Sequence, residues 1–247
     1  MTYRIGILQT DAVVEHLQPD HGDYPEMFEK LLGRLNPTIA FTTYNVQHGL
    51  PEDVSCEAYV VTGSRCSVYD DLPWIHQLVG YLQKVLASGA KVIGVCFGHQ
   101  LMAHFFGGEA SRADKGWAVG VHRSTVVASQ PWMIEADRKQ ELSLLSSHQD
   151  QVTTLPEGAT LYMTNDFCPM AGFVMDDQVI TIQGHPEFNK EYAAALMGIR
   201  REILGEEVYG KGIASLTQDT DADVVGRWLL AFIGASGDSE VSEAVNG

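Results

Sequence analysis

The sequence predicts an α/β protein with a doubly wound, mostly parallel central sheet, flanking helices and a small additional β region. Short apolar runs bounded by glycine, such as residues 92–95 (VIGV), are typical of parallel strands that are covered on both faces. These runs alternate with longer segments in which apolar residues recur at helical spacing. Strands that alternate with helices in this way indicate a doubly wound sheet.

The first 65 residues contain three predicted strands and one predicted helix. Residues 3–8 indicate a buried first strand, and residues 18–23 (QPDHGD) have the composition of a turn. Residues 24–35 carry five apolar side chains at helical spacing, so we expect a helix there. Residues 39–44 and 58–61 are the second and third predicted strands, and the third runs into the loop sequence TGSR.

A long helix and a strand follow this loop. Residues 71–73 (DLP) predict a helix start, because an acidic residue lies near the cap and a proline lies in the first turn. One apolar stripe then extends to Leu86, and Ser88 and Gly89 end the helix. Residues 91–95 form the next predicted strand, and a further helix is expected to begin directly after Cys96.

The pattern changes in the second half of the chain. Residues 109–127 indicate shorter, more polar strands, and an irregular region is expected up to about Ser143. Three strands and then two helices are expected beyond it, at residues 161–163, 172–175, 179–183, 190–204 and 222–233. Because no repeat or linker divides the chain, we expect one domain over residues 1–234. The small, polar and acidic residues 235–247 are expected to be disordered.

Composition excludes several classes of partner. The 247 residues include 16 basic and 32 acidic side chains, which gives a formal charge of −16. A surface of this charge repels nucleic acid and anionic membranes, so we expect neither as a partner. The N-terminus has no secretory signal pattern, and no segment has the roughly 20 apolar residues that span a bilayer. The four cysteines form no CxxC pair, so a reduced, cytoplasmic protein without a zinc site is expected.

The sequence GVCFG around Cys96 predicts a nucleophile at a sharp strand-to-helix turn. Small residues at Gly94 and Gly98 leave room for the strained bend. The N-terminus of the following helix favours a thiolate, and the N–H of Phe97 points to where an oxyanion would form. The alternative is a buried cysteine that only packs at the end of a strand, which is common for a lone cysteine.

A second motif, QGHPEF, places His185 directly after a predicted apolar strand. Pro186 favours an extended conformation at His185, and residues two apart in an extended segment project to the same side. Glu187 can therefore orient the imidazole and stabilise its positive charge after it takes the proton of Cys96. The alternative for this motif alone is a surface turn with solvated side chains.

The two motifs in this order resemble the class I (triad-type) glutamine amidotransferase superfamily. The sequence VVTGS at residues 60–64 resembles the oxyanion loop of that family after its third strand. The resemblance covers residues 57–200 well and residues 1–56 loosely. It is closest to a free-standing branch that includes γ-glutamyl peptidases and GMP-synthase-like glutaminase domains, with SHQDQV at residues 147–152 typical of that branch. The implied fold is flavodoxin-like.

The resemblance implies a role for each matching residue. Cys96, His185 and Glu187 would form a catalytic triad in which Cys96 attacks the γ-carbonyl carbon. The oxyanion hole would be formed by the backbone amide of Phe97 and by that of Gly63 or Ser64. The substrate would be bound by Gln100 and by the segment that contains Ser147, His148, Gln149 and Asp150. The chain departs from the family at Ser64 and Arg65, where a glycine followed by proline is usual, so the hole is expected to be preformed or less regular.

Three functions remain open from the sequence. The first is a hydrolase that cleaves the γ-glutamyl amide bond of glutamine, amines or peptides without a partner. The second is a glutaminase subunit that delivers ammonia to a synthetase partner, and the third is a non-catalytic binding or regulatory protein. A homo-oligomer is a further possibility. No GxxxxGK[ST] motif is present, so no ATP use and no cofactor are expected. His99 and His104 have no metal partner at suitable spacing, and Trp117 could line a substrate entrance or lie in the core.

Overall fold

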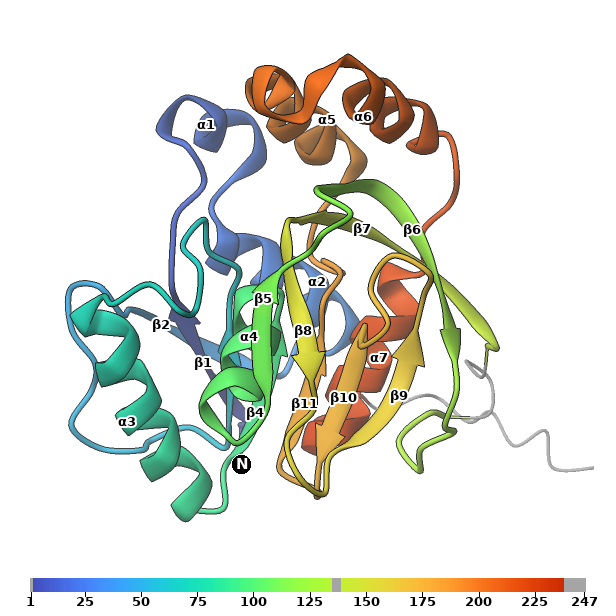
Figure 1. The fold of residues 1–247 in the computed structure, drawn as a ribbon. Helices are drawn as coiled ribbons and strands as arrows, with labels where there is room; N and C mark the ends of the chain where they lie inside the picture. Colours follow the sequence, from blue (N-terminus) through green and yellow to red (C-terminus); the bar gives the residue numbers. More distant parts are fainter. Residues whose placement is uncertain (1, 135–138, 238–247) are drawn as a thin grey trace, which may run out of the picture.

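The computed structural model describes residues 2–134 and 139–237. In this part of the chain a nine-stranded sheet, in the order β2-β1-β3-β4-β11-β10-β9-β6-β7, forms the centre of the molecule (Figure 1). The first five strands are parallel to one another: β2 (Ala40–Asn45), β1 (Arg4–Gln9), β3 (Ala58–Val61), β4 (Lys91–Val95) and β11 (Val179–Ile182). The other four are antiparallel to their neighbours: β10 (Gly172–Met175), β9 (Thr160–Thr164), β6 (Ala118–Val126) and β7 (Glu141–His148). A small second sheet pairs β5 (Glu109–Arg112) with β8 (Asp150–Thr154).

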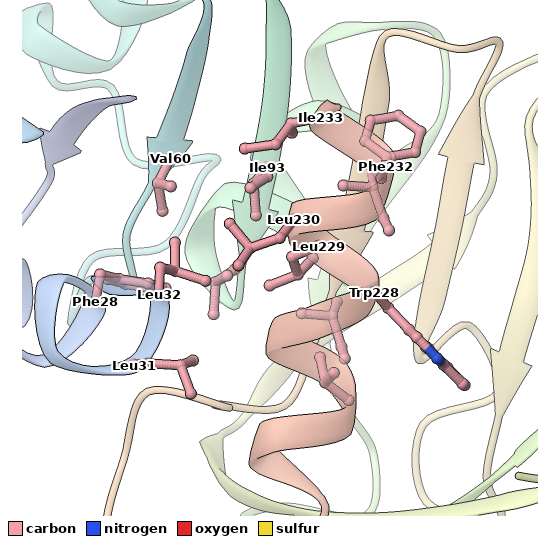
Figure 2. Packing of buried hydrophobic residues seen from close by; sticks show 14 of the residues in the cluster. Phe28, Leu31, Leu32, Val60, Ile93, Trp228, Leu229, Leu230, Phe232 and Ile233 are labelled. Carbon is pink, nitrogen blue, oxygen red and sulfur yellow. The ribbon is translucent and has the colours of Figure 1, made fainter. Parts of the chain in front are cut away.

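Helices cover both faces of the parallel half, which confirms the predicted doubly wound α/β fold. On one face α2 (Tyr24–Leu35) and α7 (Ala222–Ile233) pack against inward-facing side chains of β1, β3 and β4. Figure 2 shows this layer, where Phe28 and Leu32 lie beside Val60, Ile93 and Leu230. On the other face, α3 (Pro73–Ala87) and α4 (Phe97–Phe105) pack against the alternate side chains of the same strands. Every residue of β3 is buried, as a central parallel strand requires.

The helices α1 (Gln18–His21), α5 (Lys190–Ile199) and α6 (Arg201–Ser215) lie at one end of the molecule (Figure 1), and a 3₁₀ turn, η1 (Glu15–Leu17), directly precedes α1. The prediction of a turn at residues 18–23 was therefore wrong for its first four residues, because Pro19 is accommodated in the first turn of α1. The single helix predicted over residues 190–204 was also wrong, because the backbone leaves helical geometry at Arg200 and again at Gly205.

Two strands were not predicted from the sequence. We expected an irregular region up to about Ser143, but β7 begins at Glu141, and β8 follows it after one residue. Among the described residues, no helix is both long and apolar enough to cross a membrane. Residues 238–247, most of the tail that we predicted to be disordered, lie outside the described residues.

Candidate active site

Cys96 lies at the strand-to-helix turn that the sequence predicts. It directly follows β4 and forms the N-cap of α4, with φ 52° and ψ −100°. A positive φ is unusual for a residue other than glycine, so the backbone is strained at this cysteine. A Cβ at Gly94 would come within 2.7 Å of the Gly98 carbonyl oxygen, and a Cβ at Gly98 would come within 2.5 Å of the Val61 carbonyl oxygen. The bend therefore requires both glycines.

His185 and Glu187 follow β11, the parallel neighbour of β4. The Nδ1 atom of His185 lies 2.7 Å from Glu187 Oε1, and both side chains are almost fully buried. The ring of Phe188 stacks on the imidazole at a centroid distance of 3.9 Å. The backbone N–H of His185 donates to the carbonyl of Leu145 at 2.8 Å, which joins this loop to β7. The first two contacts fix the imidazole, and the third fixes the backbone that carries it.

The electrostatics of this group favour a charged imidazole. Burial disfavours the imidazolium, but the negative charges of Glu187 and Cys96, with hydrogen bonds that the imidazole donates to both side chains, raise the pKa of His185 to about 10. The second carboxylate oxygen of Glu187 is buried without a hydrogen-bond partner among the described residues. Among the described residues, therefore, only one oxygen of Glu187 has a hydrogen-bond partner, and that partner is His185.

The backbone at Gly63 borders the same group. A Cβ added to Gly63 would lie 3.0 Å from His185 Cε1 and 3.7 Å from Cys96 Cβ. The carbonyl of Gly63 points the other way, because it accepts a hydrogen bond from the Thr10 hydroxyl at 2.8 Å. In a trans peptide the N–H lies opposite the C=O, so the Ser64 N–H is directed away from Thr10. The hydroxyl of Thr10, which the sequence did not single out, thus fixes the orientation of this peptide.

The Phe97 amide is the first of α4 and so has no partner within the helix.

The departure from the family pattern at Arg65 has a structural role. Both the backbone N–H and the Nε of Arg65 donate to Asp11, at 2.9 and 2.7 Å. The loop after β3 is therefore fixed to the loop after β1.

A cavity of about 380 Å³ opens at Cys96 and is lined by all five predicted substrate-binding residues. The amide nitrogen of Gln100 is already bonded to the Asp150 carbonyl and to Gln183, so only its oxygen remains for a ligand. Burial lowers the pKa of His148 to about 3, so this ring is neutral, and it hydrogen-bonds to the Asp150 carbonyl at 2.9 Å.

The other members of the predicted substrate segment differ in their partners. With its amide oxygen facing Arg112, Gln149 accepts two hydrogen bonds at 2.8 and 3.1 Å, so it is turned toward the protein. The carboxylate of Asp150 accepts from the Ser67 hydroxyl at 2.5 Å, and Ser147 accepts from Arg200 at 2.8 Å. The sequence left open whether Trp117 lies at a substrate entrance or in the core, and in the structure it lines the cavity. Arg200, which was not predicted from the sequence, lines the cavity as well.

No cluster of three or more histidine, cysteine or acidic side chains in the described residues could hold a metal ion. Burial lowers the pKa of His99 to about 3, and its ring packs on Phe173 while Nδ1 bonds to Thr181. His104 accepts a hydrogen bond from the Ala110 amide. His99 is therefore buried in packing contacts, and His104 is partly buried.

The sequence profile of the family described as glutamine amidotransferase class-I matches residues 23–197. The chain belongs to this family. This assignment confirms the family resemblance and the prediction of an amide-hydrolysing enzyme.

Relatives of this class I amidotransferase include both free-standing and larger enzymes. Gamma-glutamyl peptidase 2 of Arabidopsis thaliana is 30% identical over 223 residues, which cover 86% of this chain and 88% of the relative. The glutamine-hydrolyzing GMP synthase of Streptococcus pyogenes is 25% identical, and the match covers 86% of this chain but 45% of that enzyme. A glutamine amidotransferase from Thermotoga maritima shares the fold with a TM-score of 0.76 at 16% identity, covering 94% of this chain and 99% of that structure.

Proposed function

We propose that this amidotransferase is a cysteine-nucleophile hydrolase that cleaves γ-glutamyl amide bonds through a γ-glutamyl thioester. The arrangement that carries this proposal is a strained cysteine hydrogen-bonded to a buried histidine, whose other nitrogen is held by a carboxylate at 2.7 Å. A nucleophile, a base and an orienter in this order are the elements of triad chemistry. Cys96, His185 and Glu187 take these three roles.

The reaction begins with attack of the Cys96 thiolate on the γ-carbonyl carbon. The carbonyl electrons move to oxygen, and the resulting oxyanion accepts hydrogen bonds from the Phe97 amide and the amide at Gly63 or Ser64. When the tetrahedral intermediate collapses, the C–N bond breaks and His185 protonates the leaving amine. Water, deprotonated by His185, then attacks the thioester, which releases the γ-carboxylate of glutamate and restores the thiol.

The size of the cavity favours leaving groups larger than ammonia. About 380 Å³ is within the range of pockets that hold drug-sized ligands, and glutamine is smaller than such ligands. We therefore propose γ-glutamyl peptides or amines as preferred substrates over free glutamine. The likeness to a γ-glutamyl peptidase over 86% of this chain supports this choice. The four cysteines are free, which is consistent with action in a reducing compartment such as the cytoplasm.

The test is release of glutamate by the purified chain without a partner or ATP. Glutamine, γ-glutamyl amines and γ-glutamyl dipeptides are compared at matched concentrations. We expect turnover of the peptides or amines to exceed that of glutamine and to be independent of ATP. If none is cleaved by the isolated chain, the hydrolase proposal is wrong.

A second candidate is a glutaminase subunit that delivers ammonia to a separate synthetase. The similarity to a glutamine-hydrolyzing GMP synthase supports it, because in that enzyme glutamine hydrolysis accompanies a synthesis reaction. In such systems hydrolysis is coupled to the state of the partner, so the isolated subunit is idle. Turnover of glutamine alone, and only after a synthetase is added, would establish this function. A non-catalytic protein would show neither activity.

A further inference from the structure

Arg200 brings a guanidinium group into the cavity that opens at Cys96. It lies at the junction of α5 and α6, where the backbone has φ −97° and ψ 4° and the chain changes direction. Its Nη1 atom donates to the Ser147 hydroxyl at 2.8 Å, and the guanidinium lies 5.4 Å from the ring centroid of Trp117. A hydroxyl and an aromatic face thus fix the orientation of this cation in the pocket wall.

The charge of Arg200 is not neutralised by a carboxylate. In residues 2–134 and 139–237, no carboxylate oxygen forms an ion pair with this side chain, although the chain has a formal charge of −16. Most other arginines are paired with acidic residues: Arg4, Arg34, Arg65, Arg123 and Arg201. A guanidinium has five N–H donors in a fork that matches a carboxylate, so donors remain for a ligand.

An acidic side chain lines the same cavity. Asp150 is fixed by the Ser67 hydroxyl at 2.5 Å, and no ion pair with a basic side chain is present in the described part of the chain. The cavity therefore presents one cation and one anion to a ligand. A γ-glutamyl head carries an ammonium and a carboxylate on one carbon, which complements such a pair of charges.

We propose that Arg200, fixed by Ser147 and Trp117, is the residue that binds a substrate carboxylate in this pocket. The inference rests on the proposed γ-glutamyl substrates and adds a specificity-determining residue to them. The carboxylate has two sources, the α-carboxylate of the glutamyl head or the terminal carboxylate of a leaving peptide. The recognition chemistry is the same for both, so the experiment separates them.

Binding is measured by calorimetry on the Cys96→Ala protein, with and without Arg200→Ala. Glutamine is compared with 4-aminobutanamide, which lacks only the α-carboxylate. γ-Glutamylglycine is compared with the γ-glutamyl methylamide, which lacks only the terminal carboxylate. Charge-assisted bonds of this kind contribute enough that Arg200→Ala is expected to weaken binding by roughly 10- to 100-fold. If Arg200→Ala weakens binding of glutamine, γ-glutamylglycine and the γ-glutamyl methylamide, Arg200 binds the α-carboxylate of the glutamyl head. If it weakens binding of γ-glutamylglycine alone, Arg200 binds the terminal carboxylate of the leaving group.

Arg201→Ala is the matched control, because this neighbouring arginine is exposed and already paired with Glu206. It should leave all four affinities unchanged. Arg200→Lys should restore binding only in part, since an ammonium does not form the bidentate contact. Equal weakening of 4-aminobutanamide, no weakening of any ligand, or no binding of the four ligands to Cys96→Ala would overturn the inference. Wild-type turnover, measured separately, tests the hydrolase proposal itself.

Discussion

In the proposed mechanism the reactive groups come from the parallel half of the sheet, whereas the proposed recognition groups other than Gln100 lie near the end of β7 and at the α5–α6 junction. The loops after β3, β4 and β11, all in the parallel half, supply Gly63, Cys96 and the His185–Glu187 pair. The end of β7 in the antiparallel half, with the α5–α6 junction, supplies Ser147 and the residues around it. Carboxyl ends of neighbouring parallel strands meet at one edge, so they can bring reactive groups together, whereas the antiparallel extension forms the opposite wall.

This difference predicts two kinds of mutational effect. Changes in the parallel half should lower kcat, because they remove interactions made in the transition state. Changes in the antiparallel half should mainly raise KM, because they remove binding that is equal in the ground and transition states. The following predictions test the catalytic side of this division, from the largest expected effect to the smallest, and the Arg200→Ala comparison above tests the recognition side.

Cys96→Ala should abolish activity while the protein remains folded. The thiolate is the only nucleophile assigned, so we expect kcat to fall by about 10⁴- to 10⁶-fold, as for other covalent catalytic units. Released glutamate gives the rate, and the circular dichroism spectrum gives the fold. Activity within tenfold of wild type would show that another residue is the nucleophile.

His185→Asn should approach the effect of Cys96→Ala, while Glu187→Gln should retain roughly 10- to 100-fold more activity, since the carboxylate only orients and stabilises. The proton on His185 is retained at neutral pH and lost as pH rises through about 10. The alkaline limb of kcat/KM should therefore lie near pH 10 in the wild type. In Glu187→Gln the limb should move toward neutral pH, because this variant lacks the negative charge that raises the pKa of His185. An unmoved limb would contradict this assignment.

Gly98→Ala should reduce both stability and activity. Its Cβ would come within 2.5 Å of the Val61 carbonyl oxygen, so α4 or β3 must shift, at a cost of about 1–3 kcal/mol in the free energy of unfolding. Gly80→Ala is the control in α3, where a Cβ meets no atom within 4 Å, and should increase stability by about 0.5–1 kcal/mol. Denaturant unfolding measures both. Equal stability of the two variants would mean that the bend does not require glycine.

Thr10→Val should have the smallest effect, roughly a tenfold decrease in kcat with KM unchanged. Its hydroxyl holds the Gly63 carbonyl at 2.8 Å, and without it the adjacent amide is less well oriented toward the oxyanion. Thr10→Ser keeps the hydroxyl and should retain the wild-type kcat. If Thr10→Val raised KM instead, the loop after β3 would belong to substrate binding rather than to catalysis.

The same division separates what the sequence predicted from what it did not. The parallel strands are short, continuous apolar runs, and the two motifs at Cys96 and His185 depend on local geometry, so both were predicted. The β7 strand was missed because it combines apolar residues with buried polar ones such as Ser146 and His148, whose surroundings come from distant segments. Alternation of hydrophobicity, the usual signal of a strand, is therefore absent there.

Arg200 and Thr10 could not be identified from the sequence for a related reason. A basic residue near the end of a helix is favoured by the helix dipole, so Arg200 has nothing to distinguish it from other helix-terminal cations. Its role depends on Ser147, which is distant in the sequence. The contact of Thr10 with Gly63 likewise joins two loops more than fifty residues apart. Such contacts become visible only when the strands are placed side by side.

The most direct test of the account is covalent labelling of the nucleophile by a diazo-ketone analogue of glutamine. The thiolate of Cys96 displaces dinitrogen from the protonated reagent and forms a thioether, which intact-mass and peptide mapping locate. We predict one adduct per chain, on Cys96, with labelling slowed strongly in His185→Asn. Cys66 is the internal control, because it lines the same cavity and burial raises the pKa of its thiol. Labelling of Cys66 at an equal rate, or no labelling of Cys96, would contradict the central claim.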